Sequence, residues 1–248
     1  KRDPLWSRGL GDVYKRQILT GGAGNDTFNI DSGFDTITDL SGSDILIVSS
    51  GATVSASGID AFTATSNTKN DGTANLTTDN DGGTINMEAS SSGAFTLTGG
   101  AGDDTLVGNG GSDKIYGMGG ADTITGNAGT DTIVGGEGDD IIIVASAGDA
   151  NSDIIDGGGG SDTLRLSVGS HTFDNDARIQ NIQKITLNAS GTTVNLGGQS
   201  EGLTISGGNG DDNITSGSGS DIIDAGSGSD IIYGKVGSDT ISLGNNDN

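Results

Sequence analysis

Cysteine is absent from this chain of 248 residues, and proline occurs only once. Without cysteine, no disulfide framework can hold the fold together. Aromatic residues make up 4% of the chain, which argues against a bulky globular core. No apolar run approaches the roughly 18 residues that a membrane-spanning helix needs. The sequence therefore excludes a disulfide-rich scaffold and predicts no membrane span.

Basic residues are also scarce. Eleven lysines and arginines stand against 34 acidic residues, which gives a net charge of −23. A nucleic-acid partner is disfavoured, because phosphate contacts need lysine and arginine. Thirty-one of the 34 acidic residues are aspartates. Short carboxylates placed in glycine turns indicate a ligand role rather than a mixed, solvating surface.

The first seventeen residues, KRDPLWSRGLGDVYKRQ, differ from the rest of the chain. They hold five of the eleven basic residues, the only tryptophan and the only proline. They lack the apolar segment of a signal peptide. We interpret residues 1–17 as a non-native adaptor, with a genuine basic linker as the alternative.

Glycine is abundant, at 47 residues, and it recurs in a nine-residue frame. With aspartate at position 6, the frame finds fourteen units. Position 4 is glycine in thirteen of them, with Asn151 as the exception, and position 8 is always apolar. The fourteen aspartates are Asp26, Asp35, Asp44, Asp104, Asp113, Asp122, Asp131, Asp140, Asp153, Asp162, Asp212, Asp221, Asp230 and Asp239.

Each unit has a direct physical interpretation. Positions 1 to 6 form a glycine-rich turn, in which glycine permits backbone conformations closed to other residues. Positions 7 to 9 form a short strand whose central apolar residue points inward. One apolar side chain per nine residues cannot bury a core alone, so the coils must stack. The sequence therefore predicts an all-β solenoid.

The spacing of the aspartates supplies the functional argument. Two units make one coil, so like turns recur every eighteen residues, and Asp122 stacks between Asp104 and Asp140. Two carboxylates about 5 Å apart repel by roughly 3 kcal/mol at an effective dielectric constant near 20, so such columns need a cation. Carboxylate and carbonyl oxygens in a flexible turn select Ca²⁺ over transition metals. The fourteen aspartates are thus predicted calcium ligands, and the alternative is that they only form turns.

The units resemble the RTX (haemolysin-type) calcium-binding nonapeptide repeats. The segments that carry the resemblance are GGAGNDTFN at 21–29, GGAGDDTLV at 99–107, GGEGDDIII at 135–143, GGGGSDTLR at 157–165 and GGNGDDNIT at 207–215. The resemblance implies a right-handed parallel β-roll, or β-solenoid, with several Ca²⁺ ions held between the Gly-Asp turns of successive coils. It also implies a secreted or cell-surface bacterial protein, exported by a type I system, that folds on meeting calcium.

The repeats divide the chain into blocks. Strict repeats predict a short RTX block at 18–47, a main block at 99–165 and a truncated C-terminal block at 207–248. Residues 48–98 and 166–206 lack the aspartate turns, and we interpret them as calcium-free solenoid coils, irregular in the first stretch. Stepping back in nines places Leu203, Val194 and Ile185 at position 6, where apolar packing replaces the ion. Val144–Ala147 is a four-residue insertion, predicted to bulge from one coil.

Two functions remain open. The first is a calcium-dependent structural or adhesive module, similar to bacterial surface-layer proteins and adhesins, with self-association or cell-surface glycans as further partners. The second is the calcium-binding tail of a secreted RTX enzyme or toxin whose catalytic domain lies outside this chain.

Catalysis within the chain is not predicted. The only histidine, His171, is interpreted as a solvated loop residue, and a chain with one histidine cannot carry an HExxH motif. Paired carboxylates would suit a glycosidase. Their nine-residue recurrence and the lack of an aromatic sugar platform favour calcium instead.

Overall fold

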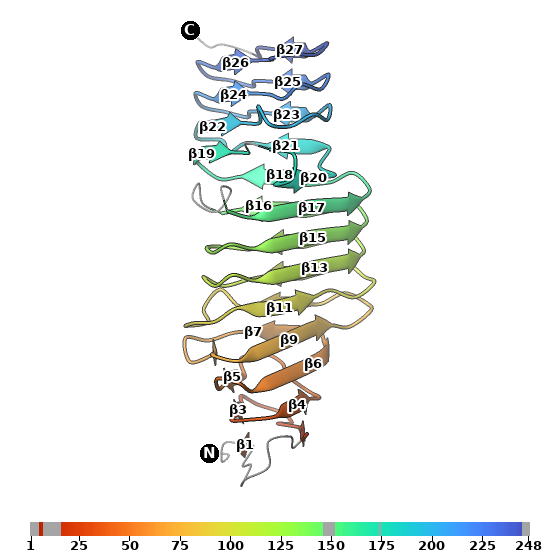
Figure 1. Cartoon of the computed structure of the whole chain (residues 1–248), viewed down its shortest axis with the longest axis vertical. Coiled ribbons are helices and arrows are strands. Elements are labelled where there is room, and N and C mark those ends of the chain that lie inside the picture. Colours follow the sequence, from red (N-terminus) through yellow and green to blue (C-terminus); the bar gives the residue numbers. More distant parts are fainter. Residues whose placement is uncertain (1–4, 7–15, 146–151, 174, 245–248) are drawn as a thin grey trace.

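The computed structural model describes residues 5–6, 16–145, 152–173 and 175–244. Over these residues the chain winds into a parallel β-solenoid of about 11 turns with no helix (Figure 1). The first and last described strands, β1 (Leu5–Trp6) and β27 (Thr240–Ser242), lie at opposite ends of a rod. The predicted all-β solenoid is confirmed, while its right-handedness stays a prediction. Within the described ranges, no helix of the length and apolarity needed to cross a membrane occurs.

Two long sheets, in which every strand pair is parallel, form most of the rod. The nine-stranded sheet contains, in order, β2 (Ile18–Leu19), β4 (Phe34–Ile37), β6 (Thr53–Ile59), β9 (Thr73–Thr78), β11 (Phe95–Thr98), β13 (Lys114–Gly119), β15 (Thr132–Glu137), β17 (Ile154–Gly159) and β20 (Ile179–Gln180). The ten-stranded sheet contains β7 (Ala61–Thr63), β10 (Thr84–Asn86), β12 (Thr105–Val107), β14 (Thr123–Thr125), β16 (Ile141–Val144), β18 (Thr163–Leu166), β21 (Lys184–Thr186), β23 (Thr204–Ser206), β25 (Ile222–Asp224) and β27 (Thr240–Ser242).

Two short sheets complete the ends of the solenoid. Near the N-terminus lie β1 (Leu5–Trp6), β3 (Thr27–Ile30), β5 (Ile45–Val48) and β8 (Lys69–Asn70). Near the C-terminus lie β19 (Gly169–Thr172), β22 (Thr192–Asn195), β24 (Asn213–Thr215) and β26 (Ile231–Tyr233). The C-terminal coils therefore pair the ten-stranded sheet with a new partner sheet, and the nine-stranded sheet ends at β20.

Coil length follows the repeat. In the main block Leu106 pairs with Ile124, and Ile124 with Ile142, so paired residues are eighteen apart. Across the insertion, Ile142 pairs with Leu164, twenty-two residues on, because the four extra residues leave the strands in register. Ile85 pairs with Leu106 at a distance of twenty-one residues. Regular repeats thus set eighteen-residue coils, and the stretches without them form longer coils in the same stack.

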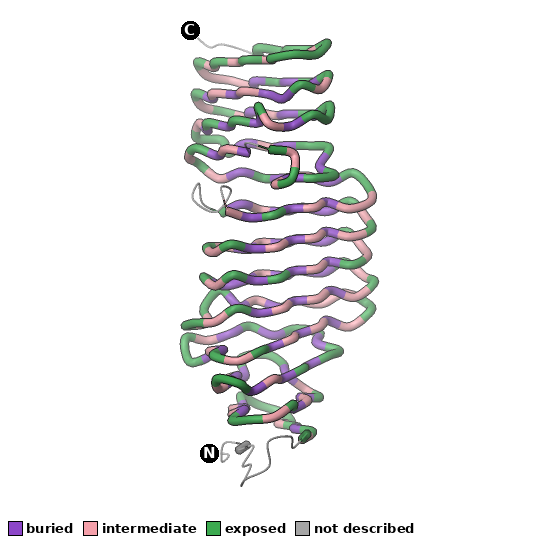
Figure 2. The backbone as a smooth tube through the Cα atoms, viewed as in Figure 1, coloured by how far each residue is buried: buried purple, intermediate pink, exposed green. Residues whose placement is uncertain are grey.

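The core consists of inward-pointing side chains that lie one above another in successive coils, and we call this continuous row the core file. The position-8 residues of the repeats are buried from Phe28 through Ile223, and the described strands alternate buried and more exposed residues, as Figure 2 shows along the tube. Burial decreases in the last coil, where Ile232 is half-buried and Ile241 is 44% exposed. Stacking, rather than any single large side chain, therefore removes the apolar surface from water.

The structure corrects the frame in the 166–206 stretch. Val194 pairs with Ile214, and Ile185 pairs with Ile205, so both occupy position 8 rather than the predicted position 6. The cause is a coil of twenty residues, which shifts the nine-residue steps by two. Leu203 does occupy position 6, because its backbone N–H donates to Asp221 one coil later. The solenoid thus continues through this stretch, with a different register from the predicted one.

The only histidine was also misplaced by sequence reasoning. His171 lies in β19 rather than in a solvated loop, and its side chain is fully buried. Its Cα is paired with that of Val194, so the imidazole points into the core file. Its Nε2 lies 2.8 Å from the carbonyl oxygen of Ser167. Two short strands that pair in register decided this placement, and the sequence alone carried no signal of it.

Two predicted segments fall largely outside the described residues. Within 1–17, Leu5–Trp6 pairs with β3 and the N–H of Gln17 donates to Asp35. The interpretation of this segment as an adaptor or linker stays a prediction. Residues 146–151, which include the end of the insertion, are not described.

The irregular stretch within 48–98 is part of the solenoid. Between residues 53 and 78 it forms the strands β6 to β9.

Candidate metal centre

The predicted aspartates form vertical columns at the turns between strands. In the main block the backbone N–H of Asp104 donates to Oδ1 of Asp122, and that of Asp122 donates to Oδ1 of Asp140, at 2.8 Å in both cases. The column continues across the insertion, since the N–H of Asp140 donates to Oδ1 of Asp162. Each aspartate thus uses one carboxylate oxygen to hold the turn of the preceding coil.

The same bond recurs in every block. It joins Asp26 to Asp44, Asp113 to Asp131, Asp131 to Asp153, Asp212 to Asp230 and Asp221 to Asp239. At the first coil of a column the donor is a residue other than aspartate: Gln17, Gly83, Phe95, Thr192 or Leu203. The repeat therefore places all fourteen aspartates in equivalent positions, twelve of them buried and the last two, Asp230 and Asp239, half-buried.

The second carboxylate oxygen has a different environment. In eight of these residues Oδ2 is buried and has no hydrogen-bond partner among the described residues: Asp26, Asp35, Asp122, Asp140, Asp162, Asp212, Asp221 and Asp230. In Asp44, Asp104 and Asp113 it instead accepts an N–H from its own turn. A buried carboxylate oxygen without a donor is costly, so the eight oxygens favour a site for a positively charged ligand.

Glycine at position 1 makes room for these oxygens. A Cβ added to Gly117 would collide with Oδ2 of Asp122 and with the carbonyl oxygen of Gly135 in the next coil. The same cradle recurs at Gly135, where the collisions would be with Oδ2 of Asp140 and the carbonyl oxygen of Gly157. A carboxylate oxygen and a backbone carbonyl oxygen from the adjacent coil therefore converge on one small space.

The pKa values of aspartates in the columns reflect the same close packing of carboxylates. Desolvation by burial raises the pKa of Asp122 to about 7, opposed by the hydrogen bond from Asp104 and reinforced by the charges of Asp140, Asp104 and Asp103. Burial likewise raises the pKa of Asp113 and of Asp212 to about 6. The charges that act on Asp122 are all negative. A cation between the coils would remove both the desolvation cost and the repulsion.

The donor set fits a hard cation. Among the described residues, no three histidine, aspartate or glutamate side chains are grouped so as to hold a metal by themselves. Any ion in the columns must therefore combine paired carboxylates with backbone carbonyls. All-oxygen sites of this kind suit Ca²⁺. The residues present fit the ion that the repeats predict.

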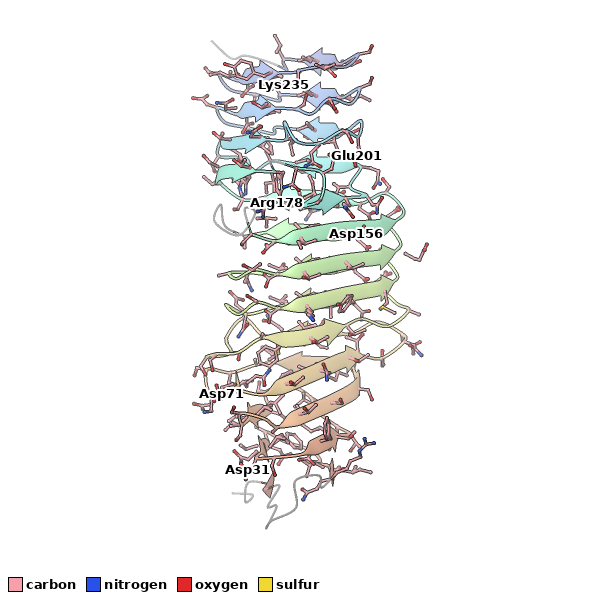
Figure 3. All side chains as sticks on the ribbon, viewed as in Figure 1. Asp31, Asp71, Asp156, Arg178, Glu201 and Lys235 are labelled. Carbon is pink, nitrogen blue, oxygen red and sulfur yellow. The ribbon has the colours of Figure 1, made fainter. Side chains whose placement is uncertain are left out.

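Other residues support the columns without being foreseen. Gln183 replaces aspartate in the longer coil after β18, where its Oε1 accepts the N–H of Asp162 at 2.6 Å. Asp39, which stands where a glycine was expected, accepts the N–H groups of Gly21 and Gly22. Asp31, Asp71 and Glu201, labelled in Figure 3, are exposed and lie outside the columns.

The comparison with protein families agrees with this geometry. The family model described as "RTX calcium-binding nonapeptide repeat (4 copies)" matches residues 18–37, 96–124, 107–142, 147–170 and 205–241. These ranges together cover just over half of the chain. The chain therefore belongs to the RTX calcium-binding nonapeptide repeat family. Comparisons with curated proteins and with solved structures find no match.

Proposed function

We propose that this chain is a calcium-stabilised structural or adhesive module of a secreted or cell-surface protein, with the fourteen position-6 aspartates as ligands. The observation that carries the proposal is the set of eight buried Oδ2 atoms without a partner, stacked in columns of like charge. We assign the module a structural rather than a catalytic role, because its paired carboxylates are enclosed between coils, where a substrate has no access.

Calcium would act here by making the stack favourable. Without it, the folded chain must bury several carboxylates beside one another and must order 47 glycines, both of which oppose folding. Bound Ca²⁺ supplies positive charge between the carboxylates, and its binding free energy becomes folding free energy. The aspartate N–H to Oδ1 bonds fix the register, so successive coils would load ions of the same kind.

Secretion gives this coupling a physical use. A chain of this composition, with many acidic residues and few aromatics, is expected to stay unfolded where free calcium is low. It would fold where calcium is at the millimolar level, outside the cell. An extended, rigid rod would then hold other parts of a protein, or other molecules, at a distance from the surface that carries it.

Circular dichroism tests the proposal directly. We expect the purified chain to gain β-sheet signal when millimolar CaCl₂ is added and to lose it when EGTA is added in excess. MgCl₂ at the same ionic strength is the control, because Mg²⁺ keeps its waters and demands a stricter octahedral geometry. Identical spectra with and without calcium would contradict the proposal.

A further inference from the structure

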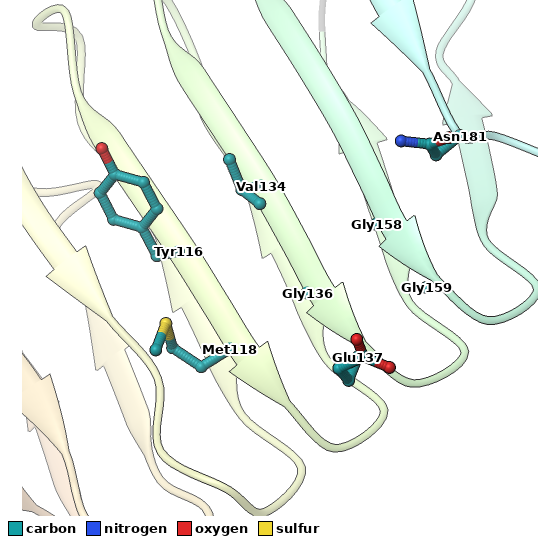
Figure 4. Close-up of a pocket in the computed structure, with 8 residues that line it drawn as sticks. All are labelled: Tyr116, Met118, Val134, Gly136, Glu137, Gly158, Gly159 and Asn181. Carbon is teal, nitrogen blue, oxygen red and sulfur yellow. The ribbon is translucent and has the colours of Figure 1, made fainter.

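A hollow of about 440 Å³ lies on the outer face of the nine-stranded sheet, and its Gly136 and Gly158 directly follow Gly135 and Gly157, which contact the aspartate columns (Figure 4). It spans three neighbouring strands, β13, β15 and β17, beside the point where that sheet ends at β20. Its lining is formed by Tyr116, Met118, Val134, Gly136, Glu137, Gly158, Gly159 and Asn181. A volume of this size lies within the roughly 300–1,000 Å³ of small-molecule sites.

The register of the strands explains why the sheet is hollow here. Met118, Gly136 and Gly158 are paired across the three strands and form one row on the outer face. Only Met118 has a side chain in this row. Gly158 has a φ of 94°, and a Cβ there would collide with the backbone of Gly136. The floor is therefore bare backbone that the fold itself requires, and Met118 forms a wall at one end.

The neighbouring row supplies an apolar wall and polar groups. Tyr116 pairs with Val134, and Val134 pairs with Asp156, so the tyrosine, the valine and the carboxylate follow one another across the sheet. Nδ2 of Asn181 donates to Oδ1 of Asp156 at 2.7 Å. This bond fixes the side-chain amide of Asn181 and leaves its Oδ1 as an acceptor. A flat aromatic ring and a fixed amide thus stand at opposite ends of the hollow (Figure 4).

The charge of the hollow limits its ligand. No lysine or arginine is among the lining residues, and Glu137 contributes a carboxylate. A Cβ on Gly159 would lie 3.0 Å from Oε2 of Glu137, so this carboxylate extends over the glycine floor. Anions are therefore disfavoured, while a neutral group rich in hydroxyl donors would find acceptors on Glu137 and Asn181.

We propose that this hollow binds one neutral pyranose ring of a glycan. A pyranose has an apolar C–H face, which can pack on the ring of Tyr116, and an edge of hydroxyl groups, which can donate to Glu137 and Asn181. The proposal rests on the proposed calcium-dependent fold, because the hollow exists only when the four consecutive coils that contain β13, β15, β17 and β20 are stacked.

Ligand-observed NMR with the calcium-loaded chain tests this site. The probes are glucose, galactose, mannose and N-acetylglucosamine, each at millimolar concentration. We expect saturation transfer to at least one of them and at least a tenfold loss of affinity in Tyr116→Ala. The matched control is Tyr233→Ala, which removes an exposed tyrosine of β26 outside the hollow and should leave binding unchanged.

A second variant separates a sugar from a cation. Glu137→Gln keeps a hydrogen-bonding side chain of the same shape but removes its charge. For a pyranose we expect a loss of affinity of about threefold, whereas tetramethylammonium, if it were the ligand class, would lose most of its binding. Binding of tetramethylammonium but of no sugar would overturn the proposal.

The failure of this proposal differs from the failure of the proposed function. A chain that gains β-sheet signal with calcium but binds none of the four sugars would overturn the sugar site alone. A chain without that gain would overturn the proposed function, and the sugar site with it. Equal loss of binding in Tyr116→Ala and Tyr233→Ala would also overturn the site, because it would show that binding does not depend on the hollow.

Discussion

Replacing Asp122 by asparagine should have opposite effects on stability with and without calcium. Asp122 is 1% exposed and stacks between Asp104 and Asp140. Asparagine has the same shape, and its Oδ1 can still accept the N–H of Asp104. The substitution therefore removes the charge at the centre of the longest column and leaves the register bond in place.

The magnitude follows from the pKa. Burial raises the pKa of Asp122 from 3.8 to about 7, roughly three units, so ionising it in the metal-free fold above pH 7 costs about 4 kcal/mol. The new amide N–H₂ would be buried near the carbonyl oxygen of Gly135, and each of its protons that stayed unpaired would lower the gain from removing the charge, by about 1–3 kcal/mol in total. The net stabilisation of the metal-free fold is then about 1–3 kcal/mol. With calcium bound, removing one carboxylate from a buried charge pair should instead cost about 3–5 kcal/mol.

Two titrations measure these effects. In EGTA at pH 8, folding driven by trimethylamine N-oxide should occur at a lower concentration for Asp122→Asn than for the parent chain, because excluded osmolytes favour the compact state. In saturating calcium, the urea midpoint should fall. The control is Asp31→Asn, which removes the same charge from an exposed carboxylate outside the columns. A shift of both midpoints in the same direction would refute the reasoning.

Three further predictions follow from the coil geometry. Gly117→Ala should lower the free energy of unfolding by at least about 1–3 kcal/mol and raise the calcium concentration at the folding midpoint, because its Cβ collides with Asp122. The control is Gly110→Ala, which has open space around it and should change the free energy of unfolding by no more than about 0.5 kcal/mol. Equal effects of the two variants in urea titrations would contradict the proposed role of Gly117. Ile124→Ala should lower the free energy of unfolding of the calcium-bound chain by about 2–5 kcal/mol, because it leaves a cavity among the buried side chains of the core. A loss of under about 1 kcal/mol would argue against a packed interior. Lowering the pH from 8 to 5 in EGTA should stabilise the metal-free fold. The raised pKa values of Asp122 and Asp113, about 7 and 6, mean that the folded chain binds more protons than the unfolded chain between about pH 4 and 7. The destabilisation of the metal-free fold by these ionised carboxylates is therefore complete above pH 7 and is lost as the pH falls. Trimethylamine N-oxide midpoints of folding that do not change with pH would contradict this prediction.

The position of every predicted ligand could be read from the sequence. A nine-residue repeat with Gly, Asp and an apolar residue at fixed places leaves one geometry in which each unit buries its apolar side chain, and that geometry stacks the aspartates. The spacing of eighteen between Asp104 and Asp122 therefore appears unchanged as a hydrogen bond between coils. The same reasoning identified Leu203 at position 6 of a coil without a ligand there.

Where the repeat stops, the sequence no longer sets the register. Val194 and Ile185 were displaced by two positions, because a longer coil keeps the strands paired and absorbs extra residues in its turns. The four-residue insertion predicted at Val144–Ala147 likewise leaves Asp140 stacked with Asp162. Backbone pairing between coils is satisfied only as a whole ladder, so the tertiary stack, not the local pattern, selects which residues face inward.

The sequence by itself determined the family, the all-β solenoid and the columns of aspartates, because these features repeat locally in every unit. Only the tertiary structure decided that His171 lies in the core and that Tyr116, Glu137 and Asn181 meet around one hollow. These residues come from three of four successive coils and share no spacing in the chain. Their proximity is set by the lateral pairing of strands, which depends on all coils at once.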